Sequence, residues 1–189
     1  MAAALRCRSN KRCPLVRLMA VAVGLRDLWG QLVTGDRSIL LSHRALAVIH
    51  RETRAAGDGC ETGGILLGTT IEKFSAIRHA GGPGPSAVRT ATTFLRDRVY
   101  SQRFAEACWS ADRSLWIGDW HSHPAMAPVP SETDLATYRS LLADSELCFG
   151  VFISLITTAT ASGVVMAAWW CTHDGVRPVA IHAERMGNH

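Results

Sequence analysis

The sequence predicts an α+β domain in which helices flank a mixed β-sheet. Its 189 residues suit one domain, and 48% hydrophobic against 19% charged residues is the composition of a globular protein with a sizeable core. Segments with strand character and segments with helix character follow one another without the strict strand–helix–strand order of a parallel α/β protein. We therefore expect one core and one functional site.

Hydrophobic periodicity, together with glycine and proline at the breaks, divides the chain into elements. The predicted elements are strands at 38–42, 61–68, two within 74–95, 114–120, 149–158, 163–172 and 176–182, and helices at 43–56, 99–110 and 131–143. Small residues begin the strand at 61–68, which indicates that another backbone or a ligand approaches closely there.

The segment 1–37 differs from the rest of the chain in its charge. It carries seven Lys or Arg against two Asp, whereas the remainder is close to neutral. We therefore expect a basic N-terminal extension at 1–37 and a domain at 38–189. The apolar stretch 15–25 resembles a signal peptide only superficially, because Arg17 interrupts it and no small-x-small cleavage site follows. An extension, a short amphipathic helix, or translation starting at Met19 are the favoured interpretations.

Two further features bear on the location of the protein and on its partners. The segment 147–172 has no charged residue, but polar residues cluster in its middle, which favours two buried strands over a transmembrane helix. The six cysteines form no C-x-x-C pair, as expected for reduced thiols in a cytoplasmic protein. With a near-neutral body, the chain is expected to bind neither nucleic acid nor membrane.

The strand predicted at 114–120 runs directly into two histidines, His121 and His123. Because side chains alternate along a strand, both imidazoles should point to one side, with Ser122 pointing to the other. Two such imidazoles can hold one ion, and catalytic zinc takes a third His or carboxylate ligand while leaving one position for water. We expect Asp134 to be this third ligand.

A second interpretation of Asp134 is structural. Ser131 and Asp134 have the spacing of a helix capping box, with Ser131 as N-cap, and taken alone this interpretation is as strong as the ligand interpretation. The nearby His-x-His pair favours the ligand.

A zinc hydrolase also needs a base that takes a proton from water and returns it to the leaving amine. Glu61 is the favoured candidate because the apolar strand that follows would hold it in a fixed, dry setting. Asp119 and Glu132 are alternatives. Cys60, beside Glu61, is not expected to be a nucleophile, because a neighbour of a strand-end acid points away from it and no histidine pairs with it in the sequence.

Together these residues resemble the JAMM (MPN+) metalloprotease signature: Glu61, then His121-x-His123 and, after seven residues, Ser131-x-x-Asp134. The resemblance covers roughly 38–182, and its flanking residues are most similar to the prokaryotic JAB branch, including deconjugating proteases of bacterial anti-phage (CBASS-type) operons with E1-like and E2-like enzymes. It implies a JAMM/MPN fold of the cytidine-deaminase-like kind. The sequence departs from eukaryotic relatives at Gly118-Asp119-Trp120, which weakens any transfer of ubiquitin-chain specificity.

The resemblance implies one Zn²⁺ per chain and hydrolysis of an isopeptide or peptide bond after the C-terminal tail of a ubiquitin-like modifier or an E1/E2-conjugated protein. A nucleotidyltransferase conjugate is one such substrate, and E1-like and E2-like proteins would be operon partners. Glu61 would be the base, and Ser131 would stabilise the oxyanion. The alternatives are C-terminal trimming of a sulfur-carrier precursor, a non-catalytic MPN scaffold, and a DNA-linked protein of the RadC type, against which Glu61-Thr-Gly-Gly and the neutral body argue.

Overall fold

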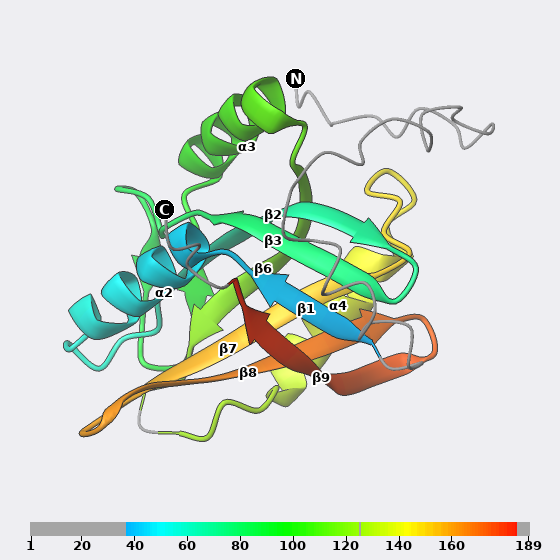
Figure 1. Ribbon diagram of the computed structural model, residues 1–189. Helices are drawn as coiled ribbons and strands as arrows, with labels where there is room; N and C mark the ends of the chain where they lie inside the picture. Colours follow the sequence, from blue (N-terminus) through cyan, green and yellow to red (C-terminus); the bar gives the residue numbers. More distant parts are fainter. Residues whose placement is uncertain (1–36, 125, 185–189) are drawn as a thin grey trace.

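The computed structural model describes residues 37–124 and 126–184 (Figure 1). The basic extension predicted at 1–37 lies almost wholly outside these residues. Helices α2, α3 and α4 span His43–Ala55, Arg98–Asp112 and Glu132–Ala143. The strands are β1 (Ser38–Leu41), β2 (Gly63–Ile71), β3 (Phe74–Ala80), β4 (Val88–Arg89), β5 (Phe94–Leu95), β6 (Leu115–Ser122), β7 (Phe152–Thr160), β8 (Gly163–Thr172) and β9 (Gly175–Ala183).

Seven of the described strands form one mixed sheet, in the order β1-β3-β2-β6-β7-β8-β9. Strand β6 is parallel to β7 and β1 is parallel to β3, whereas the other neighbours within this order are antiparallel. The predicted mixed α+β architecture is confirmed. One difference is that β1 also pairs with β9, in parallel, so that the sheet closes into a barrel (Figure 1). Sequence periodicity carries no signal for such a long-range pairing.

Three apolar clusters hold the helices to this sheet. The largest joins Ala45 and Ile49 of α2 to side chains of six strands, Trp120 and Trp170 among them. Helix α3 covers alternate residues of β2 such as Ile65, and α4 packs with Phe152 of β7 in a third cluster. Neighbouring residues of β2 and β7 thus enter different clusters, as the alternation of side chains along a strand requires.

Most predicted elements are present with shifted ends. Strand β2 begins at Gly63, so Glu61 precedes it. Between 74 and 95 the second predicted strand is wrong, because after β3 the chain instead forms the small β4–β5 hairpin. The segment 147–172 forms β7 and β8, and no described helix is long and apolar enough to cross a membrane. No disulfide joins the four cysteines among the described residues.

Two glycines at the start of β2 allow the close approach that the sequence indicates. A Cβ atom on Gly64 would lie 2.1 Å from the carbonyl oxygen of Gly81, and one on Gly63 would lie 2.4 Å from the carbonyl oxygen of Trp120. Both neighbours are backbone atoms, which cannot rotate away as a side-chain end can. The strand that follows Glu61 therefore fits only if these positions lack side chains.

Gly64→Ala is expected to lower the free energy of unfolding by about 1–3 kcal/mol, the usual cost of overpacking a buried site. Urea unfolding of the purified protein measures it. Gly150→Ala is the matched control, because a Cβ atom on Gly150 would meet nothing within 4 Å. Equal stability of the two variants would contradict the close approach at Gly64.

Candidate metal centre

His121 and His123 stand at the end of β6, held by the neighbouring strand. His121 lies within β6, and the backbone amide of His123 donates to the carbonyl of Thr157 on β7 at 2.8 Å. The hydroxyl of Thr158 donates to the carbonyl of His123 at 2.9 Å. His123 is 5% exposed. The two imidazoles approach each other through their Nε2 atoms, which are 3.0 Å apart.

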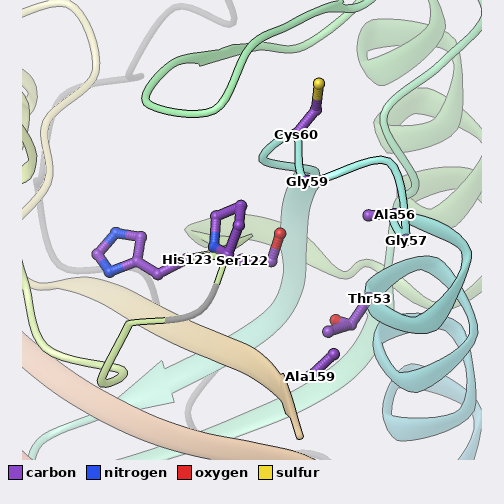
Figure 2. Close-up of a pocket in the computed structure, with 9 residues that line it drawn as sticks. Thr53, Ala56, Gly57, Gly59, Cys60, Ser122, His123 and Ala159 are labelled. Atoms are coloured by element: carbon purple, nitrogen blue, oxygen red, sulfur yellow. The ribbon is translucent and has the colours of Figure 1, made fainter.

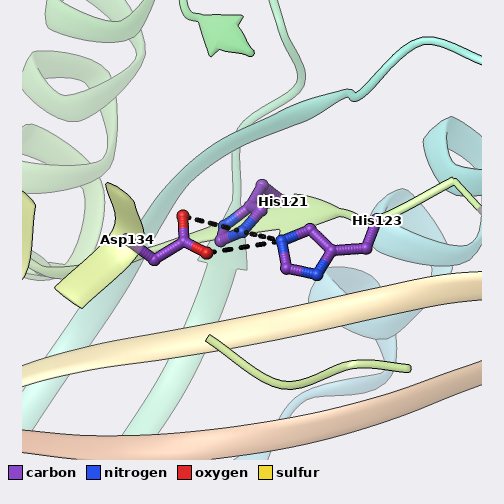
Figure 3. Close-up of side chains that lie close together, drawn as sticks. All are labelled: His121, His123 and Asp134. Carbon is purple, nitrogen blue, oxygen red and sulfur yellow. Dashed lines mark hydrogen bonds and ion pairs between the residues drawn. The ribbon is translucent and has the colours of Figure 1, made fainter. Parts of the chain in front are cut away.

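Asp134, on the first turn of α4, completes a cluster with the two histidines (Figure 3). Its Oδ1 atom is 3.3 Å from Nε2 of His121, and its Oδ2 atom is 3.4 Å from Nε2 of His123. A tetrahedral zinc ion with bonds of about 2.0–2.1 Å would separate its ligand atoms by about 3.3 Å. The donor types and their separations therefore fit such an ion.

The capping box and the ligand cluster share the Asp134 carboxylate. The backbone amide and the hydroxyl of Ser131 donate to Oδ2 of Asp134 at 2.7 Å and 2.6 Å, and the amide of Asp134 donates to the Ser131 hydroxyl at 3.2 Å. Oδ1 carries none of these capping bonds. Asp134 can thus be both a capping residue and a metal ligand, because the capping bonds hold its carboxylate in an orientation that faces the histidines.

Glu61 lies near the same cluster because β2 pairs with β6. The register places Gly63 opposite His121, and continuing it by two residues places Glu61 opposite His123. Directly opposed residues point to the same face of a sheet. Two further bonds hold the backbone: the Glu61 amide donates to the carbonyl of Thr90 at 2.7 Å, and the Arg89 side chain donates to the carbonyl of Glu61 at 2.9 Å.

The electrostatics of the cluster assign different protonation behaviour to its two carboxyl groups. Burial raises the pKa of Glu61, the charges of His121 and His123 oppose that rise, and Asp134 adds to it. Burial alone would raise the pKa of Asp134, but hydrogen bonds from the two histidines outweigh burial and lower that pKa. A carboxyl group with a raised pKa is suited to accept and return a proton.

The alternative bases lie in other settings. Asp119 accepts hydrogen bonds from the Arg96 side chain at 2.5 Å and from the indole of Trp116 at 2.9 Å. Its carboxylate is therefore already engaged. Glu132 is exposed on the first turn of α4. Sequence patterns gave no signal for Arg96 or for Arg89, because each contact depends on the folded hairpin.

A small pocket of about 210 Å³ borders His123 at the end of β6 (Figure 2). Its walls include Thr53, Cys60, Ser122 and Ala159. Small-molecule sites usually measure about 300–1,000 Å³, so this pocket is too small to indicate one. Although Cys60 lies on its wall with His123, Nε2 of this histidine is directed at Asp134.

The histidine–aspartate contacts predict how the stability of the metal-free protein changes with pH. The Asp134 carboxylate raises the pKa of His123 above its ordinary 6.5, although burial opposes it. Such a group stabilises the fold below its unfolded pKa, and the contribution is lost as pH rises through the folded pKa. The pKa of Asp134 is lowered, so its carboxylate stabilises the fold above its ordinary pKa of 3.8, and this stabilisation is lost on acidification. Chelator-treated protein should therefore lose stability as the pH rises above the ordinary histidine pKa of 6.5 and through the raised pKa of His123.

Urea unfolding at several pH values, with EDTA present, measures this loss. His123→Ala should lose less stability over the same interval, since the group whose pKa is raised is gone. Parallel pH profiles for the wild type and His123→Ala would contradict the assignment.

Comparison with known proteins identifies the family and several relatives of this chain. A protein-family model described as "prokaryotic homologs of the JAB domain" matches residues 42–172, which is more than half of the chain. A protein of Enterobacter hormaechei named "CD-NTase/cGAS isopeptidase" is 31% identical over 137 residues, covering 71% of this chain and 75% of its own length. One of Pseudomonas aeruginosa with the same name is 31% identical over 111 residues, covering 57% and 70% respectively.

Two further matches bear on chemistry and fold. A "probable metalloprotease y4qB" of Sinorhizobium fredii is 32% identical over 90 residues, covering 46% of this chain and 55% of its own length. The solution structure of protein DSY2949 from Desulfitobacterium hafniense superposes with a TM-score of 0.60 at 20% identity, covering 80% of this chain and 99% of that one. This last likeness concerns the fold alone. The resemblance to the prokaryotic JAB branch is confirmed: the chain belongs to the family of prokaryotic homologs of the JAB domain.

Proposed function

We propose that this protein is a zinc-dependent isopeptidase that hydrolyses the bond after the C-terminal tail of a protein conjugated by E1-like and E2-like enzymes. The observation that carries the proposal is the convergence of His121, His123 and Asp134, with Glu61 just before the neighbouring strand β2. The names of the relatives support a CD-NTase conjugate as the substrate. The proposal includes a cytoplasmic role in anti-phage defence.

His121, His123 and Asp134 would hold the ion, which when bound supplies Lewis-acid activation of the scissile carbonyl and of water. Glu61 takes a proton from the attacking water and delivers it to the departing amine nitrogen. Its raised pKa suits both transfers, because the protonated and ionised forms are then closer in free energy near neutral pH. In this proposal three residues hold the ion, and a fourth, Glu61, transfers the proton.

Ser131 is proposed to donate to the oxygen of the substrate carbonyl as negative charge develops there. In the structure its hydroxyl donates to Oδ2 of Asp134, so the hydroxyl must turn away from this oxygen to reach a substrate. The backbone amide of Ser131 also donates to Oδ2, so the carboxylate keeps one hydrogen bond while the hydroxyl turns. This arrangement lets Ser131 change partners without releasing Asp134.

Two of the alternative functions, precursor trimming and a scaffold role, differ in how they fit the site. Trimming of a sulfur-carrier precursor would use the same residues and differs only in the substrate, and the names of the relatives favour the conjugate. A scaffold without catalysis is disfavoured because a full set of donor side chains converges within 4.8 Å.

Purified protein is expected to carry about one zinc per chain, by the ligand count of a catalytic site. The double variant His121→Ala/His123→Ala should carry almost none, which mass spectrometry of the metal content measures. His79→Ala is the matched control, because that histidine pairs with Asp112 and not with the cluster. A folded wild-type protein that takes up no zinc after incubation with the metal would exclude the proposal.

Wild-type enzyme should cleave a substrate in which the C-terminal tail of a CD-NTase is joined to a reporter lysine through an isopeptide bond. Glu61→Gln should lower kcat at least about 100-fold, because general acid–base catalysis contributes about 10²–10⁴. Gel electrophoresis of the released reporter measures it, with Glu132→Gln as the control acid. Full activity of Glu61→Gln would remove Glu61 from the mechanism, and cleavage unaffected by chelator would remove the metal.

A further inference from the structure

We propose that Ser122, between the two histidines, is a positioning residue whose hydroxyl sets the place of Glu61 relative to the metal ligands. The inference rests on the proposed function, because it concerns the base of that reaction. Its physical basis is a hydrogen bond at the end of the β2–β6 ladder in which a side-chain oxygen replaces a backbone carbonyl as the acceptor.

The register of β2 and β6, continued by one residue, places Thr62 opposite Ser122. In a regular antiparallel ladder, a hydrogen-bonded pair exchanges two backbone bonds, each from an amide to the opposite carbonyl. Here the Ser122 amide donates to the carbonyl of Thr62 at 2.7 Å in the usual way. The Thr62 amide instead donates to the side-chain oxygen of Ser122, at 3.0 Å. The Ser122 hydroxyl thus stands in for a backbone carbonyl.

This substitution of acceptor occurs between two buried residues. Thr62 is 2% exposed and Ser122 is 4% exposed. Removing the hydroxyl would leave the Thr62 amide either without an acceptor or drawn back to the Ser122 carbonyl. A buried amide without an acceptor is costly, so the backbone has reason to shift. Either response moves Thr62, and Glu61 is the residue before it.

The same bond connects the base to the ligands. On its other edge, the Glu61 backbone is bonded to Thr90 and Arg89, which belong to the hairpin region. The Ser122–Thr62 bonds join it to the strand that carries His121 and His123. A shift along this connection would change the distance from the base to the reacting atoms while leaving the ligand side chains intact. Displacements of about 1 Å can cost about 100-fold in rate.

The test compares Ser122→Ala with Ser122→Thr in the zinc-loaded enzyme. Threonine keeps the hydroxyl and suits a strand, and Ser122 borders the small pocket beside His123 (Figure 2). Ser122→Ala should lower kcat at least about tenfold, with KM within about twofold and the zinc content unchanged. Ser122→Thr should restore most of kcat, and Ser122→Cys, a weaker acceptor of similar size, should lie between them.

Ser75→Ala is the control for the loss of a buried serine hydrogen bond. Ser75 is fully buried on β3, and its hydroxyl bonds to that of Thr70 at 2.8 Å, at the end of β2 away from the site. This variant should keep wild-type kcat. A double variant separates positioning from a general loss of stability. Because Ser122 acts through Glu61, Ser122→Ala should lower kcat little further in a Glu61→Gln background, whereas a general loss of stability would lower it in both backgrounds.

Three results would overturn the inference: wild-type kcat in Ser122→Ala, loss of zinc together with activity in that variant, or full additivity in the double variant. Its failure is separable from that of the proposed function. An inactive Glu61→Gln enzyme beside an active Ser122→Ala enzyme refutes only the role of Ser122. An active Glu61→Gln enzyme refutes the proposed base, whatever Ser122 does.

Discussion

The antiparallel pairing of β2 with β6 is the constraint on which the candidate site depends. It brings the segment before β2 alongside the end of β6, so that residues 60 positions apart in the chain become neighbours. The approach is close because the backbone of Gly81 lies against Gly64. A side chain there would push the strand away and carry Glu61 with it. The glycines after Glu61 therefore belong to the geometry of the site as much as to the packing of the fold.

A second element, the start of α4, brings the remaining ligand to this strand end. Tyr138 and Leu142 pack α4 against Phe152 of β7, and β7 is the parallel neighbour of β6. Because the helix is fixed on β7, its first turn faces the end of β6. The Ser131 cap then holds the Asp134 carboxylate in one orientation. The local requirement of a helix start and the requirement of a metal ligand are met by the same side chain.

The sequence was most informative where function depends on local spacing. Alternation along a strand predicted that His121 and His123 share a face, and the structure brings both to Asp134. Strands β7 and β8 were predicted because a polar centre distinguishes two strands from one membrane helix. Both inferences need only neighbouring residues, which a single sequence contains.

What sequence reasoning missed depends on contacts between distant segments. The closure of the barrel joins β1 to β9 across most of the domain, and neither strand has a pattern that marks its partner. The engagement of Asp119 by Arg96 likewise appears only when the β4–β5 region lies beside β6. The Ser122 hydroxyl belongs here too. Its direction away from the histidines was predictable, but its bond to the Thr62 amide requires the register.

The two carboxyl groups of the site show how one fold can give the same chemical group two roles. Asp134 lies against two imidazoles and a capping hydroxyl, and these donors favour its ionised form, as a ligand requires. Glu61 is partly buried and has Asp134 as a neighbouring like charge, and both effects favour its protonated form. Each carboxylate that ionises makes ionisation of the other harder. Asp134 has the stronger hydrogen-bond donors and stays ionised, so the pKa of Glu61 is the one that rises. Glu61 is therefore the group available to accept and release a proton.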